Sequence, residues 1–316
     1  MTLEAELVEI NSNALKGNPL GDPIERKILV FHPDRPVKDA PLLIELAGLN
    51  GTPKLNNRFS QVLKKLYSKN MLENSVIINP DFSTKYHVNQ YINSPGAGNY
   101  EDFIIKEIIP FISEKYKTGN VGLFGKSSGG FGSYTLASNH PDIISGFANH
   151  FGDSGFEYVY IPDIPVAYRE LYGTSVQNYL EEKSRKDDLK DEEIRALNII
   201  GMSAFYSYDT ENGKPELPFN MDTGMFREDI WKKWSEYDPV RNVEFRADNL
   251  KKLKAIYMDV GTKDEYSLFM GMRTLHDKMK TLGINHSYQE FNGGHFYNTP
   301  RYEESLPYLA KKLNEK

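Results

Sequence analysis

Two serines lie inside a dense group of glycines in the segment GKSSG at 125–129. The spacing fits G-x-S-x-G, in which the serine occupies a tight strand-to-helix turn with strained backbone angles. An apolar run at 121–124 predicts a strand directly before the nucleophile position, and the segment 128–140 predicts a helix directly after it. This context predicts that Ser127 is a nucleophile whose hydroxyl projects above a sheet, near the unpaired N–H groups of a helix start.

Two other interpretations of the same glycines compete with the nucleophile. A phosphate-binding loop needs G-x-x-x-x-G-K-[ST], and Lys126-Ser127 would supply its last two residues. Its first glycine would then stand at 120, where the chain has Asn120, and Gly119 is one position away. The spacing therefore disfavours a phosphate loop. A glycine turn with a purely structural role is the remaining alternative.

A serine hydroxyl becomes a useful nucleophile when a base takes its proton and a carboxylate orients that base. In the chain order of α/β-hydrolases, the serine is followed by the acid and then by the histidine. Asp264 follows a strand-like segment and a glycine in AIYMDVGTKDEYSL at 255–268, and His295 follows a strand-like segment and a Gly-Gly pair in YQEFNGGHFYNTP at 288–300. We therefore expect Asp264 to be the acid and His295 to be the general base.

Other carboxylates and histidines could compete for these two roles. Asp259 is expected at a strand end, and Glu265 stands one position beyond the preferred acid. The other histidines are expected in a helix (His276), at a strand start (His286), at the end of the helix after the motif (His140), or at most at the rim of the substrate pocket (His150 and His87).

An acyl-transfer site also needs two N–H donors for the negative oxygen of its tetrahedral intermediate. The backbone N–H of Ser128, the residue after the nucleophile, is expected to be one of them. The loop LAGLNG at 46–51 follows the third predicted strand. Gly48 lets this loop turn, and the backbone N–H of Leu49 is the best candidate for the second donor.

The elements that must position these residues alternate along the chain. Short apolar strands are predicted at 41–48, 75–80 and 121–125, and helices with one apolar face are predicted at 57–70 and 100–116. This alternation predicts a mostly parallel sheet with helices on both faces. The rhythm breaks between about 155 and 250 and returns afterwards. We therefore expect one domain, 1–316, with an insertion at 155–250.

Composition narrows the classes of function. The chain has 316 residues, a net charge of −6 and no cysteine, which disfavours a nucleic-acid surface and excludes thiolate chemistry. We see neither a secretory signal nor an apolar run long enough to span a membrane. The expected location is the cytoplasm, although secretion stays open if a leader has been removed. No cofactor and no metal ion are expected.

Together these segments resemble the esterase D-like family of α/β-hydrolases, which includes feruloyl esterases, enterochelin esterases and antigen 85-type mycolyltransferases. The insertion at 155–250 is expected to form a helical or irregular cap whose aromatic side chains wall the substrate pocket, because segments inserted before the acid strand of this fold arch over the serine. The alternative is that these aromatic residues only pack the insertion's own core. The resemblance implies an α/β-hydrolase fold with an N-terminal antiparallel strand pair. It also implies a triad of Ser127, Asp264 and His295, with Leu49 and Ser128 as amide donors. Ala47 departs from the family, where a polar residue usually precedes Gly48. The segments that carry the resemblance are NSNALKGNPLGDPIERKILVFHP (11–33), LLIELAGLNG (42–51), YEDFIIKEIIPFISEKY (100–116), GKSSGGFGSYTLASNHPD (125–142), DVGTKDEYSL (259–268) and GGHFY (293–297).

The expected function is a serine carboxylesterase that hydrolyses a small-molecule ester through an acyl-enzyme on Ser127. The same residues could serve an acyltransferase or a serine peptidase, because only the acceptor or the leaving group differs. A hydrolase-fold protein that only binds a ligand is a further alternative. The sequence names neither the acyl group nor the alcohol of the substrate, and it leaves the oligomeric state open.

Overall fold

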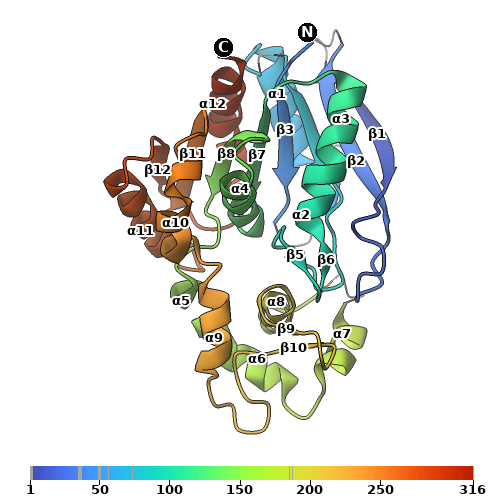
Figure 1. Cartoon of the computed structure of the whole chain (residues 1–316), viewed down its shortest axis with the longest axis vertical. Coiled ribbons are helices and arrows are strands. Elements are labelled where there is room, and N and C mark those ends of the chain that lie inside the picture. Colours follow the sequence, from blue (N-terminus) through green and yellow to red (C-terminus); the bar gives the residue numbers. More distant parts are fainter. Residues whose placement is uncertain are drawn as a thin grey trace.

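A mixed sheet forms the centre of the computed structural model, which describes residues 3–34, 38–48, 51–55, 57–72, 74–184, 186 and 188–315. Within these residues the sheet has eight strands in the order β1-β2-β4-β3-β7-β8-β11-β12 (Figure 1). All neighbours from β4 to β12 pair in parallel, whereas β2 pairs antiparallel with both β1 and β4. The predicted sheet with its N-terminal antiparallel pair is confirmed. The strands are β1 (Leu3–Asn11), β2 (Glu25–Pro33), β3 (Leu42–Leu46), β4 (Val76–Pro80), β7 (Val121–Lys126), β8 (Ile144–His150), β11 (Ala255–Gly261) and β12 (Ser287–Phe291).

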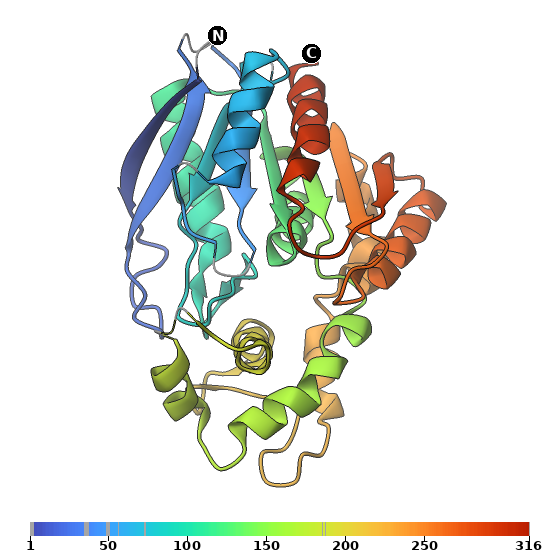
Figure 2. The same ribbon diagram turned by 180° about the vertical axis from the view of Figure 1, so that it is seen from behind.

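Helices cover both faces of this sheet, as the alternation along the chain predicts. Successive side chains of β2 point to opposite faces, so Ile28 and Val30 enter one hydrophobic core while Leu29 and Phe31 enter the other. One face packs against α1 (Arg58–Ser68) and α12 (Tyr302–Asn314), which lie in front in Figure 2. The opposite face packs against α2 (Tyr100–Asp102), α3 (Ile109–Tyr116), α4 (Ser128–Asn139), α10 (Pro239–Leu250) and α11 (Leu268–Thr281).

The helix predicted at 100–116 is continuous but not regular. Residues Phe103–Ile108 form a π-helical segment, in which the N–H of Ile109 donates to the carbonyl of Ile104. Pro110 follows at once and has no N–H to donate.

The segment between β8 and β11 is mainly helical. Beyond α5, the helices α6 to α9 lie at the end of the molecule opposite the two termini (Figures 1 and 2). In contrast, α10 packs beside the sheet against α4 and α11. The elements of this segment are α5 (Phe156–Val159), a 3₁₀ turn (Ile161–Asp163), α6 (Ile164–Leu171), α7 (Val176–Lys183), α8 (Asp191–Tyr206), α9 (Glu228–Ser235) and the two-residue strands β9 (Tyr208–Asp209) and β10 (Lys214–Pro215). Two further short strands, β5 (Asn93–Ser94) and β6 (Gly98–Asn99), precede α2, and a 3₁₀ turn (Thr299–Arg301) precedes α12.

The parallel strands bring three distant parts of the chain to one edge of the sheet. β7 ends at Lys126, β11 ends at Gly261 and β12 ends at Phe291. In parallel sheets the carboxyl ends of the strands share an edge, and ligands bind beyond it. The turns after these three strands therefore meet beneath the helices of the 155–250 segment.

Candidate active site

Ser127 occupies a strained turn between β7 and α4. Its backbone angles are φ 54° and ψ −126°, a region that non-glycine residues rarely adopt and that is found at functional sites. The neighbouring strand β3 approaches this turn so closely that a Cβ at Gly125 or Gly129 would overlap the carbonyl oxygen of Leu46. The two glycines of the motif are thus required by packing against β3, as the motif predicts.

His295 and Asp264 contact each other in the turns after β12 and β11. The Nδ1 atom of His295 lies 2.8 Å from Oδ2 of Asp264, whose side chain is fully buried. The other oxygen of Asp264 accepts the N–H groups of Tyr266 at 2.9 Å and Leu268 at 3.4 Å. Because an ionised carboxylate only accepts hydrogen bonds, Nδ1 carries the proton and Nε2 is left as the acceptor. Within the described parts of the chain, Nε2 has no hydrogen-bond partner.

Glu265, the rival acid, contributes to the same turn in a different way. Its Oε2 atom accepts the backbone N–H of His295 at 2.5 Å. The side chain lies so close to Gly294 that a Cβ there would lie 2.5 Å from Oε1 of Glu265. Glu265 therefore holds the backbone of the turn, while Asp264 contacts the imidazole.

Asp259, the other rival, belongs to a second Ser-His-Asp chain of hydrogen bonds that is closed to solvent. His150 Nδ1 lies 2.7 Å from Asp259 Oδ1, and His150 Nε2 lies 2.8 Å from Ser305 Oγ. All three residues are completely buried. Burial raises the pKa of Asp259, but His150 and Arg301 outweigh this effect and hold that pKa below its usual range. The suggestion that His150 lines the pocket is therefore wrong: the side chain ties β8 and β11 to α12.

The remaining histidines lie away from Ser127. His140 follows α4, and its Nε2 atom lies 2.6 Å from Glu101. His276 and His286 lie 2.7 Å from each other between α11 and β12. His87 lines a separate cavity of about 630 Å³, and among the described lining residues Gly48 is the one that it shares with the cavity at Ser127.

Of the two expected oxyanion donors, one lies in the described structure. Ser128 is the first residue of α4, where backbone N–H groups are unpaired. Leu49 lies outside the described residues. Its neighbour Gly48 approaches the motif closely, because a Cβ there would lie 3.2 Å from the carbonyl oxygen of Lys126 and 3.7 Å from Cβ of Ser127. The carbonyl of Ala47 accepts the hydroxyl of Tyr91.

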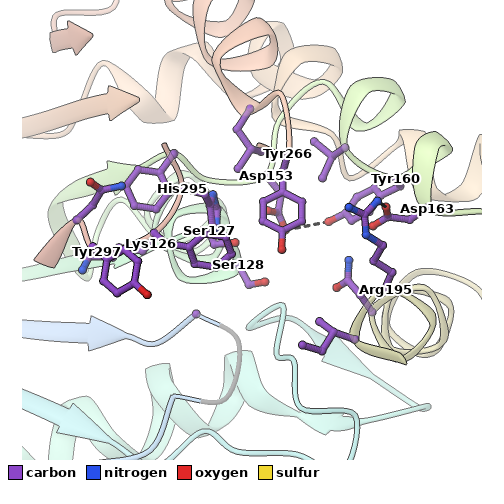
Figure 3. Close-up of a pocket in the computed structure, with 18 of the residues that line it drawn as sticks. Lys126, Ser127, Ser128, Asp153, Tyr160, Asp163, Arg195, Tyr266, His295 and Tyr297 are labelled. Atoms are coloured by element: carbon purple, nitrogen blue, oxygen red, sulfur yellow. Dashed lines mark hydrogen bonds and ion pairs between the residues drawn. The ribbon is translucent and has the colours of Figure 1, made fainter. Parts of the chain in front are cut away.

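A cavity of about 310 Å³ contains Ser127, Ser128 and His295 in its lining. Its lining combines apolar and aromatic side chains with polar ones. In Figure 3 Asp153 lies between Ser127 and the group formed by Tyr160, Asp163 and Arg195. We call five of the polar lining residues the polar wall: Asp153, Tyr160, Asp163, Arg195 and Asn198. The other lining residues are Gly48, Lys126, Phe151, Val159, Ile194, Tyr266, Leu268, Phe296, Tyr297, Asn298 and Thr299.

Charged groups in this lining are partly paired. Arg195 lies 2.9 Å from Asp163, and burial raises the pKa of Asp163 to about 6 despite that partner. Lys126 donates to Thr299 Oγ1 at 3.1 Å and lies over the Tyr302 ring, 4.3 Å from its centroid. Burial lowers the pKa of Lys126 to about 8.

The polar wall of the cavity was not foreseen from the sequence. Asp153 directly follows β8 at the carboxyl edge of the sheet, so a survey of polar residues after each strand would have found it. The side chains from the inserted segment had no such signal. Its aromatic residues mostly pack on one another, and of its tyrosines and tryptophans Tyr160 alone appears in the lining of this cavity as the structure describes it.

Two further searches concern other kinds of site. Across the described ranges, no group of three or more His, Cys, Asp or Glu side chains could hold a metal ion. In the same ranges, no helix combines the length and the apolar character needed to cross a membrane.

Comparison with solved structures finds the same architecture in several esterases. A ferulic acid esterase aligns over 99% of this chain and 99% of its own, with 17% identity and a TM-score of 0.63. An S-formylglutathione hydrolase from Staphylococcus aureus aligns over 99% and 100%, with 14% identity and a TM-score of 0.59. The fluorophosphonate-binding serine hydrolase F of Staphylococcus aureus aligns over 99% and 99%, with 12% identity and a TM-score of 0.61. At these identities the likeness shows the α/β-hydrolase fold.

Family membership is shown by a match of the sequence to a family model. No curated protein matches it, but the family model described as "Putative esterase" matches residues 23–310. That match covers most of the chain and agrees with the resemblance drawn from the motifs. The chain therefore belongs to the Esterase family of the α/β-hydrolase superfamily and is a carboxylic ester hydrolase.

Proposed function

We propose that the protein is a serine carboxylesterase in which Ser127, His295 and Asp264 form the catalytic triad. One observation carries this proposal. Ser127 and His295 line the same cavity, and the Nδ1 atom of His295 lies 2.8 Å from the buried carboxylate of Asp264. That hydrogen bond leaves Nε2 as the proton acceptor that a serine nucleophile needs. In structures without substrate the contact from serine to histidine is often loose, and it tightens in the substrate complex.

The reaction then proceeds in two halves. Ser127 Oγ forms a bond to the ester carbonyl carbon while His295 Nε2 takes the hydroxyl proton. When the bond to the alkoxy oxygen breaks, His295 returns that proton to the departing alcohol, and an acyl-enzyme remains. Water then attacks the acyl carbon with its proton going to His295, and the carboxylic acid leaves as Ser127 recovers its proton.

The negative oxygen of both tetrahedral intermediates needs two fixed donors. We assign these to the N–H groups of Ser128, at the start of α4, and of Leu49, in the loop after β3. The close approach of Gly48 to the motif supports this assignment. Fixed backbone donors stabilise developing charge without reorganising during the reaction.

We further propose that residues 155–250 are an insertion in a single domain and that their first part acts as a cap. Helices α6 to α9 lie beyond the carboxyl edge of the sheet, and Tyr160, Ile194 and Arg195 from this segment line the cavity. A cap in this position would shield the acyl-enzyme and shape the substrate site.

Labelling with a fluorophosphonate probe tests the nucleophile directly. We expect one equivalent of probe per chain, located on Ser127 by peptide mass spectrometry, and no label on a Ser127→Ala variant. The Ser305→Ala variant is a matched control, because Ser305 belongs to the buried Ser-His-Asp chain and should leave labelling unchanged. Labelling that persists in Ser127→Ala would overturn the proposal.

A further inference from the structure

Asp153 is a buried carboxyl group that lines the same cavity as Ser127. It follows β8, and only 5% of the residue is exposed. Its Oδ2 atom accepts two hydrogen bonds, from Tyr160 Oη at 2.8 Å and from Gln90 Nε2 at 3.1 Å. In the described part of the structure, its Oδ1 atom has no hydrogen-bond partner.

Oδ1 of Asp153 is not one of the fully enclosed side-chain atoms that lack a partner, so it keeps accessible surface in the cavity. A polar atom that faces a cavity can form a hydrogen bond with water or with a ligand that displaces the water. Both donors on Oδ2 come from buried side chains, so they fix the carboxyl plane. Asp153 therefore presents Oδ1 in one orientation.

The neighbouring polar groups of this wall are of two kinds. Asp163 and Arg195 form an ion pair at 2.9 Å. By contrast, the Tyr266 hydroxyl and the Asn198 side-chain amide have no hydrogen-bond partner within the described residues. Figure 3 shows the Tyr266 hydroxyl pointing into the cavity on the same side as Asp153. Convergent, unpaired polar groups in an otherwise apolar pocket fix a ligand in one orientation.

The charges around the cavity argue for a neutral polar ligand. A carboxylate or phosphate would meet Asp153 and Asp163, whereas an ammonium group would meet Arg195 and Lys126. A hydroxyl group carries no charge and can either donate or accept. Burial raises the pKa of Asp153, partly offset by Tyr160 and Gln90, and a hydroxyl can bond to either form of the acid.

We propose that Asp153 binds a hydroxyl group of the substrate, so that the preferred esters carry a free hydroxyl near the scissile bond. The proposal rests on the proposed esterase function of this cavity. The hydroxyl could belong to the acyl group or to the alcohol, and both sources place the same hydrogen-bonding group against Oδ1. Asp153 is then a specificity-determining residue, and Ser127, His295 and Asp264 perform the reaction.

Matched pairs of esters that differ by one hydroxyl test this proposal. For the acyl group, ethyl 3-hydroxybutanoate is compared with ethyl butanoate, and for the alcohol, glycerol monobutanoate is compared with propyl butanoate. We expect the wild type to favour the hydroxylated member of at least one pair by tenfold or more in kcat/KM, because a site with a buried hydrogen-bonding group rejects analogues that lack its partner. Equal kcat/KM values within both pairs would overturn the proposal. A preference for ethyl 3-aminobutanoate over ethyl 3-hydroxybutanoate would also overturn it.

Variants at Asp153 separate recognition from folding. In Asp153→Ala the ratio of kcat/KM between the paired esters should fall at least fivefold. In Asp153→Asn, which keeps the shape and an acceptor, part of the preference should return. Asp163→Asn is the matched control, since that carboxyl lines the same wall but is ion-paired, and it should keep the wild-type ratio. A ratio that falls in Asp163→Asn and stays in both Asp153 variants would contradict the assignment.

A purely structural role of Asp153 predicts a different pattern, in which both members of a pair lose activity equally. Fluorophosphonate labelling and hydrolysis of p-nitrophenyl acetate are measured in parallel on every variant. If the wild type fails these two measurements, the proposed esterase function itself is wrong. If it passes them and shows no hydroxyl preference, only the role of Asp153 is wrong.

Discussion

The adjacent serines of the motif, Ser127 and Ser128, differ in backbone conformation. Ser127 has the strained backbone of the turn, whereas Ser128 begins the regular helix α4 and its hydroxyl accepts a bond from Gln90 at 3.3 Å. Strain at Ser127 is maintained by the glycines on either side and by the close passage of β3. The backbone, more than the residue type, therefore distinguishes the two hydroxyls.

Replacing each serine in turn tests this distinction. Ser127→Ala should reduce kcat for a p-nitrophenyl ester by about 10⁴ to 10⁶, as removal of a triad member does. Ser128→Ala should reduce kcat by less than about tenfold, because it keeps the backbone N–H that is proposed to stabilise the oxyanion. An inactive Ser128→Ala variant beside an active Ser127→Ala variant would contradict the proposed nucleophile.

Asp259, within β11, and Asp264, in the turn after it, should give opposite phenotypes. Asp264→Asn should fold normally and lose about 10⁴ in kcat, because the amide favours the wrong imidazole tautomer. Asp259→Asn should keep kcat but lower the free energy of unfolding by about 3–5 kcal/mol, since it leaves Arg301 and His150 without their buried carboxylate. Steady-state kinetics and urea denaturation measure the two effects. If Asp259→Asn lost activity without losing stability, Asp259 and not Asp264 would be the acid of the triad.

At the scale of elements, β3 and β7 bring two titratable groups together beneath the turn at Ser127. Glu45 on β3 accepts hydrogen bonds from Asn79 at 2.8 Å and from Tyr302 at 3.2 Å. Burial raises the pKa of Glu45 to about 7, and Lys126 at the end of β7 only partly opposes this effect. Lys126 directly precedes the proposed nucleophile, and the pKa values of Glu45 and Lys126, about 7 and about 8, both lie near neutral pH.

This arrangement predicts a pH dependence of stability. Between about pH 4.5 and 7 the folded protein keeps the Glu45 proton while the unfolded chain releases it, so the folded state binds more protons and stability falls as pH rises. Glu45→Gln removes that titration and should flatten the decline of the urea midpoint over this range. Asp209→Asn, at an exposed turn, serves as a control that should keep the wild-type slope. Identical slopes in wild type and Glu45→Gln would refute the assignment.

At the scale of the whole molecule, the segment between β8 and β11 builds its own core and also reaches the cavity. Trp234 is fully buried, packs against Tyr160 and Tyr206, and donates its Nε1–H to Ser207 at 2.8 Å. Phe296, from the turn after β12, is 54% exposed and lines the cavity. Aromatic residues thus stabilise the segment in one place and face the substrate site in another.

Two aromatic substitutions should separate these roles. Trp234→Ala should cost about 3–5 kcal/mol of stability and reduce kcat/KM by a similar factor for every ester in a panel. Phe296→Ala should leave the melting temperature nearly unchanged and alter kcat/KM by different factors for different esters, since a lost apolar contact affects only substrates that use it. A uniform response in both variants would mean that Phe296 does not contact substrate.

Much of the fold could be predicted because its signals are local. Short apolar runs, helical spacing and glycine turns are properties of neighbouring residues, and they correctly predicted the mostly parallel sheet and the strand-to-helix turn at Ser127. The antiparallel N-terminal pair was correctly expected from the family resemblance. The family was recognisable for the same reason, since its motifs are short segments in a fixed order. The roles of Ser127, Asp264 and His295 stay predictions that the experiments above can test.

Tertiary structure decided what depends on packing between distant segments. Asp259 and Asp264 both lie at or just after the end of β11, yet one is enclosed with His150, 109 residues away, while the other faces His295. Asp153, Gln90 and Tyr160 meet because the loop after β4 and the segment after β8 come together in the folded chain. Such contacts arise from the burial of apolar faces across the whole molecule, so the residues that form them carry no local pattern. The sequence alone therefore determined the class of enzyme, and only the folded chain revealed which polar groups remain unpaired beside the proposed nucleophile.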